Sequence, residues 1–203
     1  MMNLTAITEP EAFYVKHLLD SLSLLPLLDD YAPAEGPCRL LDIGSGAGFP
    51  GVPIKIMRPE TEVLLLDSLK KRCRFLEELI SALKVDKITA LHSRAEDAAR
   101  RKTLRERFDL VTARAVASLP VLLELALPFL RTGGCFLAMK SNDEELASAG
   151  KALKLLNGEY IASRRLSLPG DQGERVILVF RKSGAVPGRF PRKAGTPGRK
   201  PLI

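Results

Sequence analysis

The residues best suited to chemistry lie in one glycine-rich stretch, L-L-D-I-G-S-G-A-G-F-P-G, at positions 40–51. A short apolar run precedes the glycines, so they occupy the turn after a predicted buried strand. Glycine tolerates positive φ and lets a ligand approach the main chain closely. The next helix offers free N–H groups and the positive end of its dipole. The pattern predicts a site for a nucleotide-like ligand with an anionic group, and a plain tight turn is the alternative.

Two interpretations of this loop imply different ligands. From Gly46, the sequence G-A-G-F-P-G matches the dinucleotide fingerprint, whereas from Asp42, D-I-G-S-G-A-G matches the pattern of S-adenosylmethionine (SAM)-dependent methyltransferases. A dinucleotide turn has its first glycine at the strand end, but Gly46 lies three residues beyond Ile43, where the apolar run stops. The loop therefore favours SAM over NAD. The loop residues expected to contact this cofactor are Gly44, Ser45, Gly46, Gly48 and Phe49.

Polar residues also follow the next two predicted strands, and ligands of a parallel sheet bind beyond the carboxyl ends of its strands. Asp67 comes directly after the predicted strand 62–66, where a carboxylate typically accepts hydrogen bonds from ribose hydroxyls. A solvated aspartate at a strand end is the alternative. Ala95 and Glu96 follow the predicted strand 87–91 and are placed to flank an adenine. A glutamate at a helix start is equally explained by its favourable interaction with the helix dipole.

Three residues are candidates for contact with the substrate. Arg114 follows the predicted strand 108–113 and can bind a carboxylate or phosphate through two parallel hydrogen bonds. Lys140 follows the next strand and is less specific, because any surface lysine would show the same pattern. His17 lies on a predicted helix with Asp20 nearby, and a partly buried helix histidine is the alternative to a base.

The elements that must position these residues alternate along the chain. Strands are predicted at 39–43, 62–66, 87–91, 108–113, 134–139, 159–168 and 175–181. Helices are predicted at 50–57, 69–83, 95–102, 119–130 and 143–156, and residues 9–30 predict one helix that breaks near Pro26 and a short second one. Alternation predicts an α/β fold with a mostly parallel seven-stranded sheet and helices on both faces. The last two strands predict a C-terminal antiparallel hairpin. This ending favours a Rossmann-like class I methyltransferase, because a dinucleotide fold continues to a sixth parallel strand.

Length and composition indicate one domain. The 203 residues, 46% of them hydrophobic, suffice for a sizeable core. We expect an N-terminal helical segment over 1–36, a SAM-binding core over 37–182 and a basic segment rich in proline and glycine over 183–203.

The net charge of +7 is concentrated at the C-terminal end of the chain. Seven of the 31 basic residues and no acidic residue lie beyond position 180, so the other 24 basic residues balance all 24 acidic ones. Proline and glycine predict a loop or tail here rather than a helix. Such a segment is typical of polyanion binding, and a solvated mobile tail is the alternative. The expected polyanion contacts are Arg189, Arg192, Lys193, Arg199 and Lys200.

Composition disfavours metal and membrane functions. The three cysteines form no C-x-x-C pair and there are two histidines, so we expect no metal site and a reducing, cytoplasmic environment. The longest apolar stretch, 116–130, is interrupted by two prolines and a glutamate and is too short to span a bilayer.

Seven motifs spread along the chain are jointly far more specific than the glycine loop. They are N-L-T-A-I-T at 3–8, H-L-L-D-S-L at 17–22, L-D-I-G-S-G-A-G-F-P-G at 41–51, L-L-D-S-L-K-K-R-C-R-F-L at 65–76, S-R-A-E at 93–96, R-A-V-A-S-L at 114–119 and P-R-K-A-G-T-P at 191–197. In these motifs the chain resembles the bacterial ribosomal RNA small subunit methyltransferase G family, also called glucose-inhibited division protein B. Members of that family usually carry a longer N-terminal helix before N-L-T-A-I.

The resemblance implies SAM-dependent methylation of N7 of a guanine in 16S ribosomal RNA, presented as free RNA or in the 30S subunit. By position it implies that SAM contacts Gly44 and Phe49, Ala95 and Glu96, and Arg114, and it assigns RNA phosphates to the basic segment. Guanine N7 carries a lone pair and no proton, so we expect no general base and assign no catalytic residue. We expect a monomer. A small-molecule or protein methyltransferase, or a non-catalytic RNA-binding protein on the same fold, remains the alternative.

Overall fold

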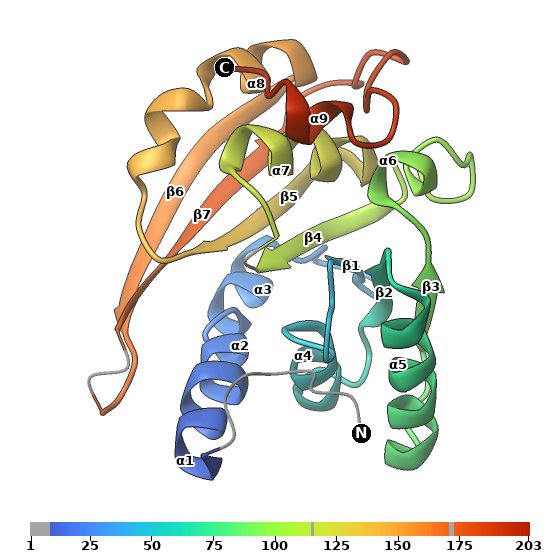
Figure 1. Ribbon diagram of the computed structural model, residues 1–203, viewed down its shortest axis with the longest axis vertical. Helices are drawn as coiled ribbons and strands as arrows, with labels where there is room; N and C mark the ends of the chain where they lie inside the picture. The colour runs from blue at the N-terminus through green and yellow to red at the C-terminus, as the bar shows by residue number, and fades with distance from the viewer. Residues whose placement is uncertain (1–8, 115, 171–172) are drawn as a thin grey trace.

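Seven strands form one sheet at the centre of the molecule (Figure 1): β1 (Arg39–Ile43), β2 (Glu62–Asp67), β3 (Ile88–His92), β4 (Phe108–Arg114), β5 (Leu130–Lys140), β6 (Gly158–Ser167) and β7 (Glu174–Lys182). The computed structural model describes residues 9–114, 116–170 and 173–203. The strand order is β3-β2-β1-β4-β5-β7-β6. Strands β1 to β5 are parallel, whereas β7 runs antiparallel to both β5 and β6. This topology confirms the predicted fold class, including the C-terminal hairpin.

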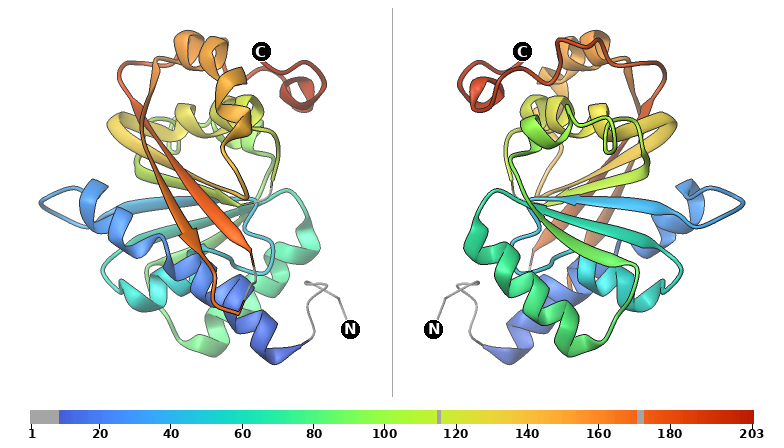
Figure 2. Two further views of the ribbon diagram at one scale, coloured as in Figure 1. Left: turned by 90° about the vertical axis from the view of Figure 1, so that its left-hand side faces the viewer. Right: turned by 90° about the vertical axis from the view of Figure 1, so that its right-hand side faces the viewer.

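Helices cover both faces of the sheet (Figures 1 and 2). Below the sheet in Figure 1 lie α1 (Pro10–Phe13), the π-helical turn η1 (Tyr14–Leu19), α2 (Asp20–Leu22), α3 (Leu25–Tyr31), α4 (Gly51–Met57) and α5 (Lys70–Leu83). Above it lie α6 (Ala95–Ala98), α7 (Leu119–Ala126), the 3₁₀ turns η2 (Leu127–Phe129) and η3 (Glu144–Ser148), α8 (Gly150–Leu156) and α9 (Thr196–Arg199). Among the described residues, no helix is long and apolar enough to cross a membrane.

Two hydrophobic cores, one on each face of the sheet, explain why its central strands are mostly apolar. In β1, Leu40 packs against the core under α3 and α4, whereas its neighbour Leu41 packs against the core under α7. Successive side chains of a strand point to opposite faces. A strand covered by helices on both faces therefore has apolar residues at most positions.

Some predicted boundaries were wrong. The helix predicted over 119–130 is α only to Ala126, because Pro128 cannot continue the helical hydrogen-bond pattern. The helix predicted over 143–156 is a 3₁₀ turn followed by α8. The helix predicted over 95–102 ends at Ala98. The motif at residues 3–8 lies outside the described residues, and the division at 36/37 and 182/183 stays a prediction.

The prediction of a loop or tail at the C-terminal end was also wrong in part. Residues 189–203, here called the C-terminal strap, contain the short helix α9 and pack above α7 (Figures 1 and 2). Phe190, Pro191 and Pro197 are buried. Proline is tolerated in the first turn of a helix, where an N–H would have no intrahelical partner, so Pro197 permits α9.

Candidate active site

The glycine loop, residues 44–50, joins β1 to α4 with three glycines in the left-handed region. Their φ values are +72° at Gly44, +58° at Gly46 and +98° at Gly48. A Cβ on Gly44 would lie 2.7 Å from Cγ2 of Val116, whereas one on Gly46 would meet only the Gly44 carbonyl oxygen at 3.8 Å. Both positions favour glycine through φ, but only Gly44 also lacks room for a side chain.

Asp42 fixes the start of this loop from inside the protein. Its carboxylate is fully buried, and Oδ2 accepts a hydrogen bond from the N–H of Gly51 at 3.1 Å, in the first turn of α4. The Thr112 hydroxyl donates to Oδ1 at 3.3 Å, and the Ser45 hydroxyl donates to the Asp42 carbonyl at 2.9 Å. Burial raises the pKa of Asp42 to about 6, although the hydrogen bond from Gly51 opposes the rise. Asp42 therefore braces the loop, a role that its place in the sequence motif does not reveal.

Asp67 at the end of β2 also braces the loop. It is buried, its Oδ2 accepts from the N–H of Gly46 at 3.0 Å, and its Oδ1 accepts from the N–H of Leu69 at 2.9 Å. The guanidinium of Arg72 approaches Oδ2 at 3.4 Å. The predicted contact between the Asp67 carboxylate and a ribose stays a prediction.

A cavity of about 230 Å³ lies beside the glycine loop. Gly44, Ala95, Glu96 and Val116 line it, so the structure brings together residues from the ends of β1 and β4 and from the start of α6. The strap contributes Gly195 and Gly198 to the same lining. Three of the residues expected to contact SAM, Gly44, Ala95 and Glu96, thus share one cavity.

A second cavity, of about 550 Å³, lies at the carboxyl ends of β4 and β5. It holds the three substrate-side candidates, His17, Arg114 and Lys140. Arg114 donates to Oδ2 of Asp20 at 3.0 Å and to the Lys16 carbonyl at 2.9 Å. Lys140 forms an ion pair of 2.7 Å with Glu145 and donates to the Ala117 carbonyl at 3.2 Å. These contacts hold the two cations in place at the cavity wall.

His17 and Phe49 pack beside Arg114. The two rings are stacked with centroids 5.0 Å apart, and the Arg114 guanidinium lies 5.4 Å from the Phe49 centroid. Nη2 of Arg114 lies 3.1 Å from Nδ1 of His17. A guanidinium only donates, so Nδ1 accepts and the imidazole is neutral. Burial, and then the charge of Arg114, lower the pKa of His17, which agrees with that protonation state.

One member of the larger cavity that the sequence did not indicate is Arg175. Arg175, on β7, forms a second ion pair with Asp20 at 3.3 Å, so one buried carboxylate meets two arginines. Asp20 follows His17 by three residues, but nothing in the local sequence indicates that β7 would reach it. The hairpin must fold before these side chains meet.

Comparison with known proteins decides the family. The profile described as GidB: rRNA small subunit methyltransferase G matches residues 1–168. The chain is 50% identical over 204 residues to ribosomal RNA small subunit methyltransferase G of Desulfitobacterium hafniense, an alignment that covers 100% of this chain and 82% of that protein. Its identity to the Geobacillus kaustophilus protein of the same name is 49% over 203 residues, with 99% and 84% covered.

The chain belongs to the rRNA small subunit methyltransferase G family. Solved structures support the fold independently. TrmN from Thermus thermophilus superposes with a TM-score of 0.59 at 20% identity, covering 80% of this chain and 48% of that one. A precorrin-6y C5,15-methyltransferase from Geobacter metallireducens gives a TM-score of 0.59 at 14% identity, covering 87% and 90%. These identities show a shared fold alone.

SAM is the cofactor that this family and fold imply, and the residues present fit it. The fit rests on Gly44, where a side chain would collide with Val116, and on the cavity beside it. Because Val116 itself lines the cavity, a side chain at position 44 would displace part of the cavity wall. Gly44, Ala95 and Glu96 would hold the cofactor in this member of the methyltransferase G family.

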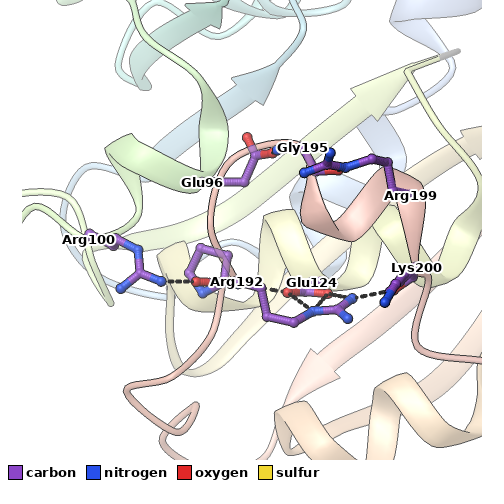
Figure 3. A network of polar contacts seen from close by, with 8 residues as sticks. Glu96, Arg100, Glu124, Arg192, Gly195, Arg199 and Lys200 are labelled. Carbon is purple, nitrogen blue, oxygen red and sulfur yellow. Dashed lines mark hydrogen bonds and ion pairs between the residues drawn. The ribbon is translucent and has the colours of Figure 1, made fainter.

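The family motif P-R-K-A-G-T-P at 191–197 lies in the strap, and Figure 3 shows its contacts. Arg192 forms a two-pronged ion pair with the fully buried Glu124 of α7, with Nη2 to Oε2 at 2.6 Å and Nε to Oε1 at 2.9 Å. Arg192 is therefore turned toward the protein. The other four predicted polyanion contacts are exposed: Arg189, Lys193, Arg199 and Lys200. Their contact with RNA stays a prediction.

Proposed function

We propose that the chain transfers the methyl group of SAM to N7 of a guanine in 16S ribosomal RNA. The observation that carries this proposal is the presence of two cavities at the carboxyl ends of β1, β4 and β5. Arg114 lines the larger cavity, whereas Val116 and Ala117, which closely follow it in the chain, line the smaller one. A cofactor in the smaller cavity and a base in the larger one would be neighbours.

The charges of the larger cavity suit an RNA base and its phosphates. Lys16, Arg114, Lys140 and Arg175 attract phosphate, and Arg114 is held at the cavity wall by its bonds to the Lys16 carbonyl and to Asp20. A guanine methylated at N7 becomes cationic, and the carboxylates of Asp20 and Glu145 reduce the repulsion that the cations would exert on it.

In this reaction the side chains need only to position the two reactants. SAM, when bound, supplies an electrophilic methyl group. Because guanine N7 has no proton to lose, no residue needs to act as a base, and the neutral His17 serves to orient Arg114 and Phe49. Orientation of two reactants contributes up to about 7–11 kcal/mol in well-arranged systems. We further propose that the chain acts as a monomer in the cytoplasm.

The test is methyl transfer from isotope-labelled SAM to three substrates: 30S subunits, naked 16S rRNA and, as a control, 23S rRNA. We expect labelled 7-methylguanosine in digests of 16S rRNA from one or both forms, and none from 23S rRNA. Label on another atom or another base would overturn the N7 assignment. Transfer to protein or small molecules in a cell extract, with no label on either 16S substrate, would favour the alternative methyltransferases.

A further inference from the structure

We propose that the C-terminal strap is a wall of the cofactor cavity, and that Glu124 and Glu96 are the positioning residues that hold this wall in place. The proposal rests on the proposed function in one respect, that the smaller cavity holds the cofactor. Glu124 does not line the cavity, so it would act on the reaction only through the strap, whereas Glu96 lines the cavity and also binds the strap.

The wall is formed by backbone from the far end of the chain. Gly195 and Gly198 line the same cavity as Gly44 of the glycine loop, although they lie about 150 residues beyond it in the sequence. Oε1 of Glu96 accepts a hydrogen bond from the N–H of Gly195 at 2.8 Å (Figure 3). Glu96 is only 7% exposed, so water does not replace this contact freely. A residue expected to contact the cofactor thus also holds the strap.

The main anchor of the wall is the buried carboxylate of Glu124. It accepts hydrogen bonds from the backbone N–H of Arg192 at 2.8 Å and from the guanidinium of the same residue. Arg192 in turn donates to the Lys200 carbonyl at 2.7 Å and so ties the segment before α9 to the residue after it. A carboxylate with no exposed surface requires a charged partner, and this requirement makes the strap's position specific.

Two arginines from the segment after α6 donate hydrogen bonds to the first residues of the strap and to the segment just before it. Arg100 donates to the Pro191 carbonyl. Arg105 donates to the Phe190 carbonyl at 2.9 Å and to the Val186 carbonyl at 2.7 Å. The anchors of the strap therefore lie on α6, on the turn after it and on α7. Residues of α6 and α7 also line the smaller cavity, so loss of an anchor on either helix would loosen the strap's side of that cavity.

The first experiment measures affinity for S-adenosylhomocysteine by calorimetry in Glu124→Gln. Loss of a charge-assisted, two-pronged contact should weaken binding about tenfold. The matched control is Asp29→Asn, which breaks the exposed two-pronged pair with Arg58 far from the cavity and should leave affinity unchanged. In turnover, Glu124→Gln should raise the KM for SAM about tenfold and change kcat less than twofold. A merely unstable variant would instead lose kcat with its folded fraction.

The second experiment uses the wild-type chain and does not depend on any variant folding. Trypsin can cut the exposed strap after Lys193 and after Arg199. Saturating S-adenosylhomocysteine should slow both cuts about tenfold relative to cuts after Arg164 or Arg165 on β6, because the ligand would rest against the strap. Equal rates with and without ligand, or unchanged affinity in folded Glu124→Gln, would overturn the wall. A wild type that binds no S-adenosylhomocysteine would overturn the proposed function itself.

Discussion

The glycine loop and the C-terminal strap line one cavity, yet they are held by different kinds of contact. The loop is shaped by backbone: three glycines at positive φ, and N–H groups of Gly46 and Gly51 that donate to the carboxylates of Asp67 and Asp42. The strap is held by side-chain charge, chiefly the Glu124–Arg192 pair. Substitutions in the loop should act through shape and burial, and substitutions in the strap through charge.

The two regions also differ in how far apart in the sequence their hydrogen-bonded residues lie. Both loop carboxylates lie within 21 residues of the N–H groups that they accept from. The strap's contacts span 68 residues to Glu124 and 99 residues to Glu96. A local motif can encode the first region, whereas the second exists only after α6, α7 and β7 have assembled. The following experiments test this difference, from the largest expected effect to the smallest.

The largest effect should come from Asp42, which braces the loop. Its pKa is about 6 in the folded protein and 3.8 when unperturbed, so the folded state holds the proton more tightly. The stability from this proton is present below about pH 4 and is lost as pH rises through 6, a change of about 3 kcal/mol. The stability of Asp42→Asn relative to wild type should therefore rise by about 2–3 kcal/mol between pH 4 and 7.5.

Urea unfolding at several pH values measures this difference. Asp29→Asn is the control, because that carboxylate is exposed and its substitution should give a difference that varies little with pH. A flat difference for Asp42→Asn as well would show that burial does not perturb Asp42, and that its carboxyl group has the same pKa in the folded and the unfolded protein.

The next largest effect should come from Gly44 compared with Gly46. In Gly44→Ala, a strained φ combines with the collision against Val116, and strain of about 1–3 kcal/mol should weaken S-adenosylhomocysteine binding roughly 10–100-fold. In Gly46→Ala only the left-handed φ is unfavourable, at about 1–2 kcal/mol, and part of that falls on folding rather than binding. Calorimetry on both folded variants tests the order. A greater loss at Gly46 would contradict the assignment of Gly44 as the position of closest approach.

The strap's exposed cations should affect RNA binding but not the cavity. Arg189→Ala/Lys193→Ala/Lys200→Ala removes three side chains that make no ion pair among the described residues. Counterion release predicts that the slope of log K for 16S rRNA against log salt becomes shallower by up to about 2–3 units. S-adenosylhomocysteine affinity should stay the same. An unchanged slope would leave these residues as a solvated surface, and weaker cofactor binding would mean that they also hold the strap.

The sheet and the glycine loop could be predicted from the sequence, because both depend on residues that are neighbours in the chain. Alternating strands and helices predict a parallel sheet, and a terminal pair of strands with a short connection predicts the antiparallel hairpin. The glycine pattern after β1 predicts the cofactor loop because φ is a property of single residues. Three of the residues expected to bind SAM, Gly44, Ala95 and Glu96, line one cavity for the same reason: each lies shortly after the carboxyl end of a strand of a parallel sheet.

The strap and the second cavity could not be predicted, because their contacts join distant segments. Glu124 stands alone in the apolar run L-P-V-L-L-E-L-A-L at 119–127, which already indicates a buried charge that needs a partner. Nothing local indicates that the partner is Arg192 rather than another of the 31 basic residues. Arg175 and Asp20 meet in the same way, since β7 reaches the N-terminal helices only in the folded sheet.

The smallest effect should come from His17, the residue with the most familiar catalytic side chain. In a mechanism that needs no base, His17→Ala removes only the contacts that orient Arg114 and Phe49, so single-turnover methyl transfer should fall less than about tenfold. Loss of a general base typically costs roughly 10²–10⁴-fold. Because burial and Arg114 lower the pKa of His17, the imidazole is already neutral at pH 7, and the wild-type rate should stay flat from pH 7 to 8.5.

Arg114→Lys is the matched comparison for His17→Ala. It keeps the positive charge but loses the guanidinium that donates to the Lys16 carbonyl and to Asp20, so it should lower the rate more than His17→Ala does. A loss above a hundredfold in folded His17→Ala, together with a pH dependence that disappears in that variant, would make His17 a base and move the chemistry from positioning to proton transfer.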